Sequence, residues 1–132
     1  MGLNWKGKQV EAEIIARLKL ALGDIGLDIE GEGKQQLYPG HGVITGTLRR
    51  SIHAASGDHV FAADAAGQEL GGSAPQAVER SNRLLIAVGS GLNYAMTVHQ
   101  GHGAFQGYHY MTNAVQRAAP RALDHVRRRS AR

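Results

Sequence analysis

Apolar residues near the start of the chain recur every three or four positions, which is the spacing of one face of an α-helix. The stripe consists of Val10, Ile14, Leu18, Ala21, Leu22 and Ile25. Off this stripe, Glu13 precedes Arg17 by four residues, and such an ion pair stabilises a helix. Glycine weakens helices, so at Gly23 and Gly26 the helix either frays or needs packing to continue. The pattern therefore predicts a helix over residues 6–22.

Glycine-rich segments and short β-prone runs follow this helix. Residues 31–46 contain five glycines and one proline, which is typical of a loop. The hydroxyl of Thr45 can accept a backbone N–H, so we expect Thr45 to cap a short helical turn over residues 46–50. Two β-prone runs flank Gly57-Asp58, which predicts a hairpin. Residues 64–82 are rich in Gly, Ala and Ser without a period, which predicts a mobile loop.

The second half of the chain contains the clearest strand and a second long helix. Arg83–Val88 is a short apolar run that predicts a strand, and Tyr94–His99 are expected to form a short helix. The final helix has an apolar stripe of Met111, Val115, Ala118, Ala122 and Val126. Pro120 lies inside this pattern, removes one backbone hydrogen bond, and predicts a kink.

Together these elements predict an α+β fold, in which a small antiparallel sheet packs against a long N-terminal helix and a C-terminal helix. A chain of 132 residues supports one hydrophobic core, so we expect residues 1–132 to form a single domain. Cysteine is absent, which excludes disulfides and thiolate metal sites. No apolar run approaches the roughly 20 residues of a membrane span. The N-terminus lacks the apolar segment of a secretory signal, and a cytoplasmic protein is expected.

Positive charge is concentrated at the C-terminal end of the chain. Residues 117–132 contain six arginines and one aspartate, a balance of +5, whereas residues 1–116 have a balance of −1. One interpretation is a basic, solvent-exposed tail over residues 127–132, where arginine also suits the dipole of a helix end. The alternative is a small nucleic-acid-binding module that uses these arginines to contact phosphates.

Two motifs invite a ligand-binding interpretation. His99, His102 and His109 cluster in one region, but no HExxH motif, cysteine or nearby acidic residue accompanies them. Gly89-Ser90-Gly91 follows a predicted strand as in dinucleotide-binding turns, but Tyr94 occupies the place of the third glycine. We therefore expect neither a metal site nor a nucleotide or other cofactor.

Catalytic residues are not grouped convincingly. Ser51 and His53 would share one face of a strand with Asp58 nearby, but no glycine elbow presents the serine. Arg49 and Arg50 could grip a phosphate, although adjacent residues cannot both face one surface, and arginine more often pairs with carboxylates. The sequence predicts that the protein is not an enzyme.

An ordered set of short motifs resembles one family of structural proteins. Thr45-Gly46-x-Leu48-Arg49-x-Ser51-Ile52 is followed by a strand ending in Val88-Gly89. Asn93-Tyr94-Ala95, Val98-His99-Gln100-Gly101 and a helix opening at Tyr110-Met111 complete the set. In this order the motifs resemble the tail-completion or head–tail joining (neck) proteins of long-tailed bacteriophages, over about residues 5–126.

The resemblance implies a non-enzymatic virion protein, assembled in the bacterial cytoplasm and located at the head–tail junction. It would form a homo-oligomeric ring between the capsid connector and the tail tube, with DNA passing through the channel and no membrane contact. The resemblance leaves a neck protein and a tail terminator as alternatives. The expected interface residues are Arg49, Arg50, Tyr94, His99, His102, Phe105, Tyr108, Arg127 and Arg128.

Overall fold

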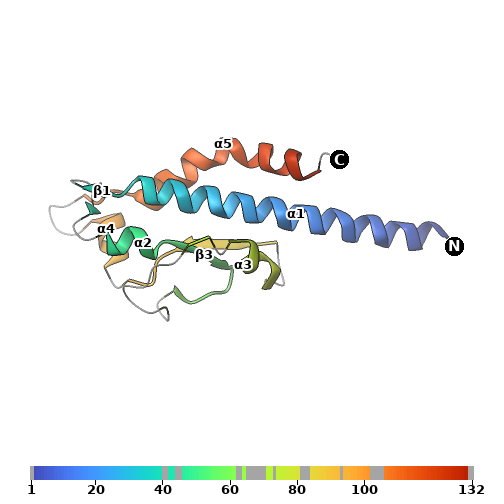
Figure 1. The fold of residues 1–132 in the computed structure, drawn as a ribbon, viewed down its shortest axis with the longest axis horizontal. Helices are drawn as coiled ribbons and strands as arrows, with labels where there is room; N and C mark the ends of the chain where they lie inside the picture. The colour runs from blue at the N-terminus through green and yellow to red at the C-terminus, as the bar shows by residue number, and fades with distance from the viewer. Residues whose placement is uncertain are drawn as a thin grey trace.

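The computed structural model describes residues 2–39, 42–43, 46–61, 64, 71–72, 74–80, 84–92, 94–101 and 106–130. In chain order the elements are α1 (Gly2–Gln35), β1 (Tyr38–Pro39), β2 (Gly42–Val43), α2 (Thr47–Ser51), β3 (His53–Ser56), α3 (Ala74–Arg80), β4 (Ile86–Gly89), α4 (Ala95–Gln100) and α5 (Tyr110–Ser130). Helix α1 forms the long axis of the molecule (Figure 1). Helix α5 lies along one side of α1, and β3 and α3 lie on the other.

The predicted fold class is confirmed, but the strands pair differently from the expected hairpin. Strands β3 and β4 are antiparallel, with His53 opposite Gly89 and Ser56 opposite Ile86. The turn after β3 is closed by a hydrogen bond from the His59 N–H to the Ser56 carbonyl, at 3.0 Å. Among the described residues no strand follows this turn directly, so the local hairpin prediction was wrong. Strands β1 and β2 form a separate two-residue parallel pair.

Helix α1 is longer than the sequence predicted, because its glycines serve close packing. The helix continues through Gly23 and Gly26 to Gln35, so the predicted end near residue 22 was wrong. A Cβ atom added at Gly26 would lie 2.7 Å from the Ile86 side chain. One added at Gly23 would contact Pro75 at 3.4 Å. The close approach of neighbouring elements outweighs the low helix propensity of glycine.

The main hydrophobic cluster lies at the end of the molecule where α1 stops. It consists of Leu37, Leu48, Ile52, Leu92, Ala95 and Tyr110. The aromatic ring of Tyr110 opens α5, and its hydroxyl donates a hydrogen bond to the Ala95 carbonyl at 2.9 Å. Burial, with a smaller contribution from Tyr94, raises the pKa of Tyr110 to about 12. This cluster fixes α2, α4 and the start of α5 against the end of α1.

Two further segments differ from their predictions. Within the range 64–82, expected to be a mobile loop, Ala74–Arg80 forms α3, with Ala74 and Val78 buried. The other residues of that range, apart from positions 64, 71 and 72, lie outside the described residues. Helix α2 begins after Gly46, which adopts a left-handed conformation with φ of 81°, so the helix-capping position lies one residue beyond the predicted Thr45. Thr45 itself is not among the described residues.

Helix α5 confirms the predicted final helix, and its predicted apolar stripe is confirmed in part, since Ala118 is buried and Met111 packs against the hydrophobic cluster. Its buried side chains are Tyr110, Ala114 and Ala118, whereas Val115 of the predicted stripe is exposed. The helix continues through Pro120, whose effect on the helix axis stays a prediction. Residues 127–130, expected to belong to a basic tail, are helical. No described helix is both long enough and apolar enough to span a bilayer.

Candidate assembly surface

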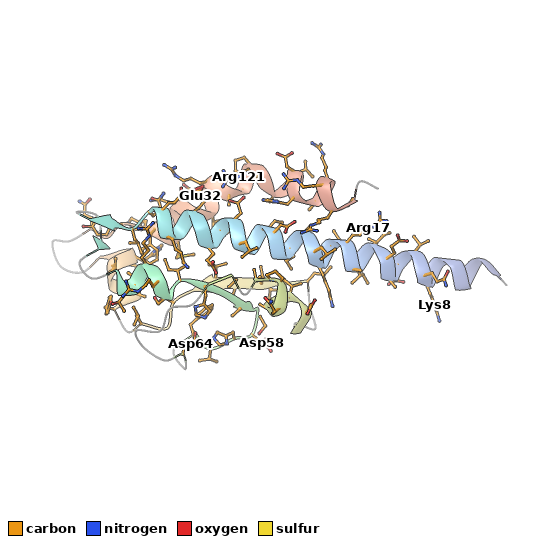
Figure 2. The ribbon with its side chains drawn as sticks, in the orientation of Figure 1. Lys8, Arg17, Glu32, Asp58, Asp64 and Arg121 are labelled. Carbon is orange, nitrogen blue, oxygen red and sulfur yellow. The ribbon has the colours of Figure 1, made fainter. Side chains whose placement is uncertain are left out.

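The N-terminal part of α1 is a long exposed surface that carries apolar side chains. Every residue from 7 to 16 is exposed, and we call this stretch the projecting segment. It extends beyond α5 and the β3–α3 side of the molecule (Figure 1), with Lys8 on its surface (Figure 2). Val10 and Ile14 are 53% and 52% exposed. They belong to the same helical stripe as Ala21, which is buried. The stripe is thus buried by the rest of the chain at Ala21 and exposed at Val10 and Ile14.

Ion pairs between α1 and α5 determine which part of the stripe is covered. Arg129 donates two hydrogen bonds to Asp24, at 2.6 and 2.9 Å. Arg121 donates two to Asp28, at 2.8 and 2.6 Å, and a third to Glu32 at 3.1 Å (Figure 2). Arg17 donates to the Ser130 carbonyl, at 3.1 Å. These contacts fix the alignment of the two helices, so that α5 ends beside Arg17 and leaves the preceding turns of α1 uncovered.

The pKa values of the aspartates in these pairs follow from their partners. Hydrogen bonds from Arg121 hold the pKa of Asp28 below its ordinary value, and His125 adds to this effect. Hydrogen bonds from Arg129 lower the pKa of Asp24 in the same way. Both carboxylates are therefore stabilised in their charged form, and their contribution to the α1–α5 contact depends on that charge.

A groove lies beside the covered part of α1, close to where the projecting segment ends. It has a volume of about 320 Å³ and lies between α1, α3 and the end of α5. Leu20, Pro75 and Val78 supply apolar walls, and charges of both signs surround them. Leu20, which did not fit the predicted stripe, is 51% exposed at this groove.

The expected interface residues do not form one surface. Arg49 and Arg50 are exposed on α2, and Tyr94 is exposed beside α4. Arg127 and Arg128 are exposed on the last turns of α5, and the C-terminal end of this helix lies away from α2 and α4 (Figure 1). His102 and Phe105 lie outside the described residues.

His99 and Tyr108 belong to the junction between α4 and α5. The Tyr108 N–H donates to the Val98 carbonyl, and the His109 N–H donates to the His99 carbonyl, both at 2.9 Å. The ring of His99 accepts a hydrogen bond from the Met111 N–H at 3.3 Å, and so satisfies a donor in the first turn of α5. Burial, together with the nearby His109, lowers the pKa of His99. His99 therefore has a structural role as a neutral acceptor at the start of a helix.

Ion pairs within the chain weaken the alternative that the C-terminal arginines bind nucleic acid. Arg121 and Arg129 pair with Asp28 and Asp24, so their charges are balanced within the chain. Arg127 and Arg128 remain exposed, and Arg127 lies 4.0 Å from Asp124. Phosphate binding by the C-terminal arginines stays a prediction, with fewer unpaired charges than the sequence suggested.

The serine, histidine and aspartate considered for catalysis do not form a relay. The Ser51 hydroxyl donates to the Leu48 carbonyl at 2.7 Å and lies 2.6 Å from the Ser90 hydroxyl. The ring of His53 bonds to the Ser51 backbone carbonyl at 2.7 Å, and no bond from this ring to the Ser51 hydroxyl is found. Asp58 is exposed in the turn after β3. The side-chain arrangement needed to activate Ser51 is not formed by these residues.

Another acidic residue, Asp64, meets His53 instead. One Asp64 carboxylate oxygen lies 2.9 Å from Nε2 of His53, and the other lies 2.9 Å from Nε2 of His59. The sequence did not indicate this cluster, because only the fold brings Asp64 next to His53 on β3. The spacing of the three residues along the sequence offered no recognisable motif.

Comparison with known proteins does not identify the chain. No family model matches it, and no curated protein or solved structure is similar enough to be a significant match.

Proposed function

We propose that the protein is a structural component of the head–tail junction of a long-tailed bacteriophage, where it acts as a neck or tail-completion subunit. Two observations support the proposal. The first is the ordered set of sequence motifs that resembles this family. The second, which carries the most weight, is the uncovered continuation of the α1 stripe at Val10 and Ile14.

The projecting segment suits contact between neighbouring subunits. Exposed apolar side chains on a long helix are costly in water and are typical of protein interfaces. The groove lined by Leu20, Pro75 and Val78 starts at Ala16, where the projecting segment ends, and lies beside α3. We propose that the projecting segment of one subunit occupies this groove in the next. Such a contact joins two different surfaces, and repeating it around an axis closes a ring.

The function is tested by removing the gene from the phage that encodes the chain. Negative-stain electron microscopy of the resulting lysate should show filled heads and complete tails that are not joined. Supplying the wild-type protein in trans should restore joined particles. Joined, infectious particles in the absence of the protein would rule out this function.

A further inference from the structure

We propose that His53, His59 and Asp64 bind one zinc ion. This inference is independent of the assembly function, because it rests only on the side-chain cluster between β3 and the turn that follows it. The ligand atoms of the three residues all lie within 4.8 Å of one another. Two histidines and one carboxylate are a ligand set that zinc and related divalent ions use in proteins.

The hydrogen bonds of His53 determine which of its ring nitrogens faces the cluster. Nδ1 lies 2.7 Å from the Ser51 carbonyl oxygen, which can only accept, so Nδ1 carries a proton. In the neutral ring Nε2 then presents a lone pair, and it lies 2.9 Å from an Asp64 carboxylate oxygen. A lone pair and a carboxylate at this distance repel, so the contact requires a positive charge between them, which either a second ring proton or a bound metal ion supplies. The bond from Nδ1 to a carbonyl is also the usual second contact of a zinc-binding histidine.

His59 completes the cluster from the other side of the carboxylate. Its Nε2 lies 2.9 and 3.0 Å from the two Asp64 oxygens. In a tetrahedral zinc site with ordinary bond lengths, neighbouring ligand atoms are about 3.3 Å apart. The histidine–carboxylate distances lie near this value, and the two histidine nitrogens, within 4.8 Å of each other, would have to turn towards the shared ion.

The surroundings hold the three residues in place. The ring of Phe61 packs edge-on against both histidines. Its centroid lies 5.1 Å from the ring centroid of His53 and 4.9 Å from that of His59. The Asp64 N–H donates to the Phe61 carbonyl at 3.0 Å, which closes the turn that presents the carboxylate. A Cβ atom at Gly91 would lie 2.2 Å from the Phe61 carbonyl oxygen, so glycine lets this turn approach the backbone after β4.

Both histidines of the cluster border a cavity. This cavity has a volume of about 200 Å³ and reaches Gln76 on α3. Zinc held by three protein ligands takes a water molecule as the fourth. Bound zinc would link Asp64 to His53 on β3 and would keep one coordination position open for water.

The test is a zinc titration of the full-length protein after removal of metal with a chelator. Isothermal titration calorimetry should show one zinc ion bound per chain. His59→Gln and Asp64→Asn, which change partly exposed ligands, should each weaken binding by about a hundredfold or more. His109→Gln changes a histidine outside the cluster and should bind zinc like the wild type. Circular dichroism of each variant establishes that it is folded.

A second measurement needs no variant. Zinc added to the wild-type protein should shift the ring NMR signals of His53 and His59 and leave those of His99 and His109 unchanged. The proposal is overturned if the wild type binds no zinc, if Asp64→Asn binds it equally well, or if the signals of His99 and His109 are the ones that shift.

Discussion

At the scale of single residues, the glycines of α1 have different surroundings although they share one helix. An added methyl group at Gly26 would meet Ile86 at 2.7 Å and Ala74 at 3.1 Å. At Gly31 nothing lies within 4 Å of the added atom. Gly26 therefore permits the close approach of β4 and α3, whereas Gly31 only weakens the helix.

The pair Gly31→Ala and Gly26→Ala tests this difference. Gly31→Ala should raise the free energy of unfolding by about 0.5–1 kcal/mol, because alanine favours the helix and has room. Gly26→Ala should gain less or lose stability, since the neighbouring side chains have to move. Urea denaturation of both variants measures the effect. Equal stabilisation by the two substitutions would show that Gly26 is not closely packed.

His99 gives a prediction about pH at the same scale. The folded protein binds a proton at His99 less readily than the unfolded chain, whose ordinary pKa is 6.5. The stability due to neutral His99 is therefore complete above pH 6.5 and declines as the pH falls towards the folded pKa.

The pKa of His99 is measurable by NMR titration in metal-free buffer. The ring should titrate below 6.5 in the wild type, and His109→Gln should raise the midpoint only part of the way back, because burial is the larger cause. A midpoint at or above 6.5 in the wild type would contradict the assigned role of His99 at the start of α5.

At the scale of elements, charged side chains align α5 along α1. Asp28 accepts hydrogen bonds from Arg121 and His125, and Asp24 accepts from Arg129. Folding lowers the pKa values of Asp24 and Asp28 below their ordinary value of 3.8. The stability that the two charged carboxylates supply is therefore fully present at any pH above 3.8. It is lost as the pH falls through the lower pKa values of the folded state.

Asp28→Asn should lower the free energy of unfolding at pH 7, and its difference from the wild type should shrink as the pH falls below 3.8. Asp124→Asn is a suitable control, because Asp124 is exposed and lies 4.0 Å from its partner Arg127. Urea denaturation at several pH values provides the comparison. A deficit of Asp28→Asn that persists undiminished in acid would mean that the charge of Asp28 is not the cause.

The sequence predicted the elements with clear periodicity and missed those that depend on tertiary packing. The C-terminal helix and the strand near Ile86 were expected. The second half of α1 was not, since glycine propensity alone argues against it. Helix α3 was missed because seven residues are too few to establish a helical period. The partner of β3 was also missed, because β4 begins thirty residues after β3 ends.

The candidate sites also depend on tertiary packing, which the sequence pattern does not reveal. The apolar stripe containing Val10 and Ile14 is visible in the sequence, but only the position of α5 shows that this part is uncovered. The cluster of His53, His59 and Asp64 requires a turn that brings Asp64 back to β3. Sequence spacing gives no information on such a return.

At the scale of the whole molecule, the protein combines a closely packed end with a helix that projects from it (Figure 1). The packed end contains the hydrophobic cluster around Ile52 and Tyr110. The projecting segment carries apolar side chains that no part of the described chain buries. This division suits a subunit that folds by itself and completes its apolar burial by assembly.

The most direct test of this account is sedimentation velocity of the wild type and the double variant Val10→Glu/Ile14→Glu over a range of protein concentrations. Leu123→Glu is the matched control, because Leu123 is 56% exposed on a helix and lies outside the projecting segment. The wild type and Leu123→Glu should form oligomers as concentration rises, and the double variant should stay monomeric. A wild type that is monomeric throughout, or a double variant that assembles like it, would contradict the account.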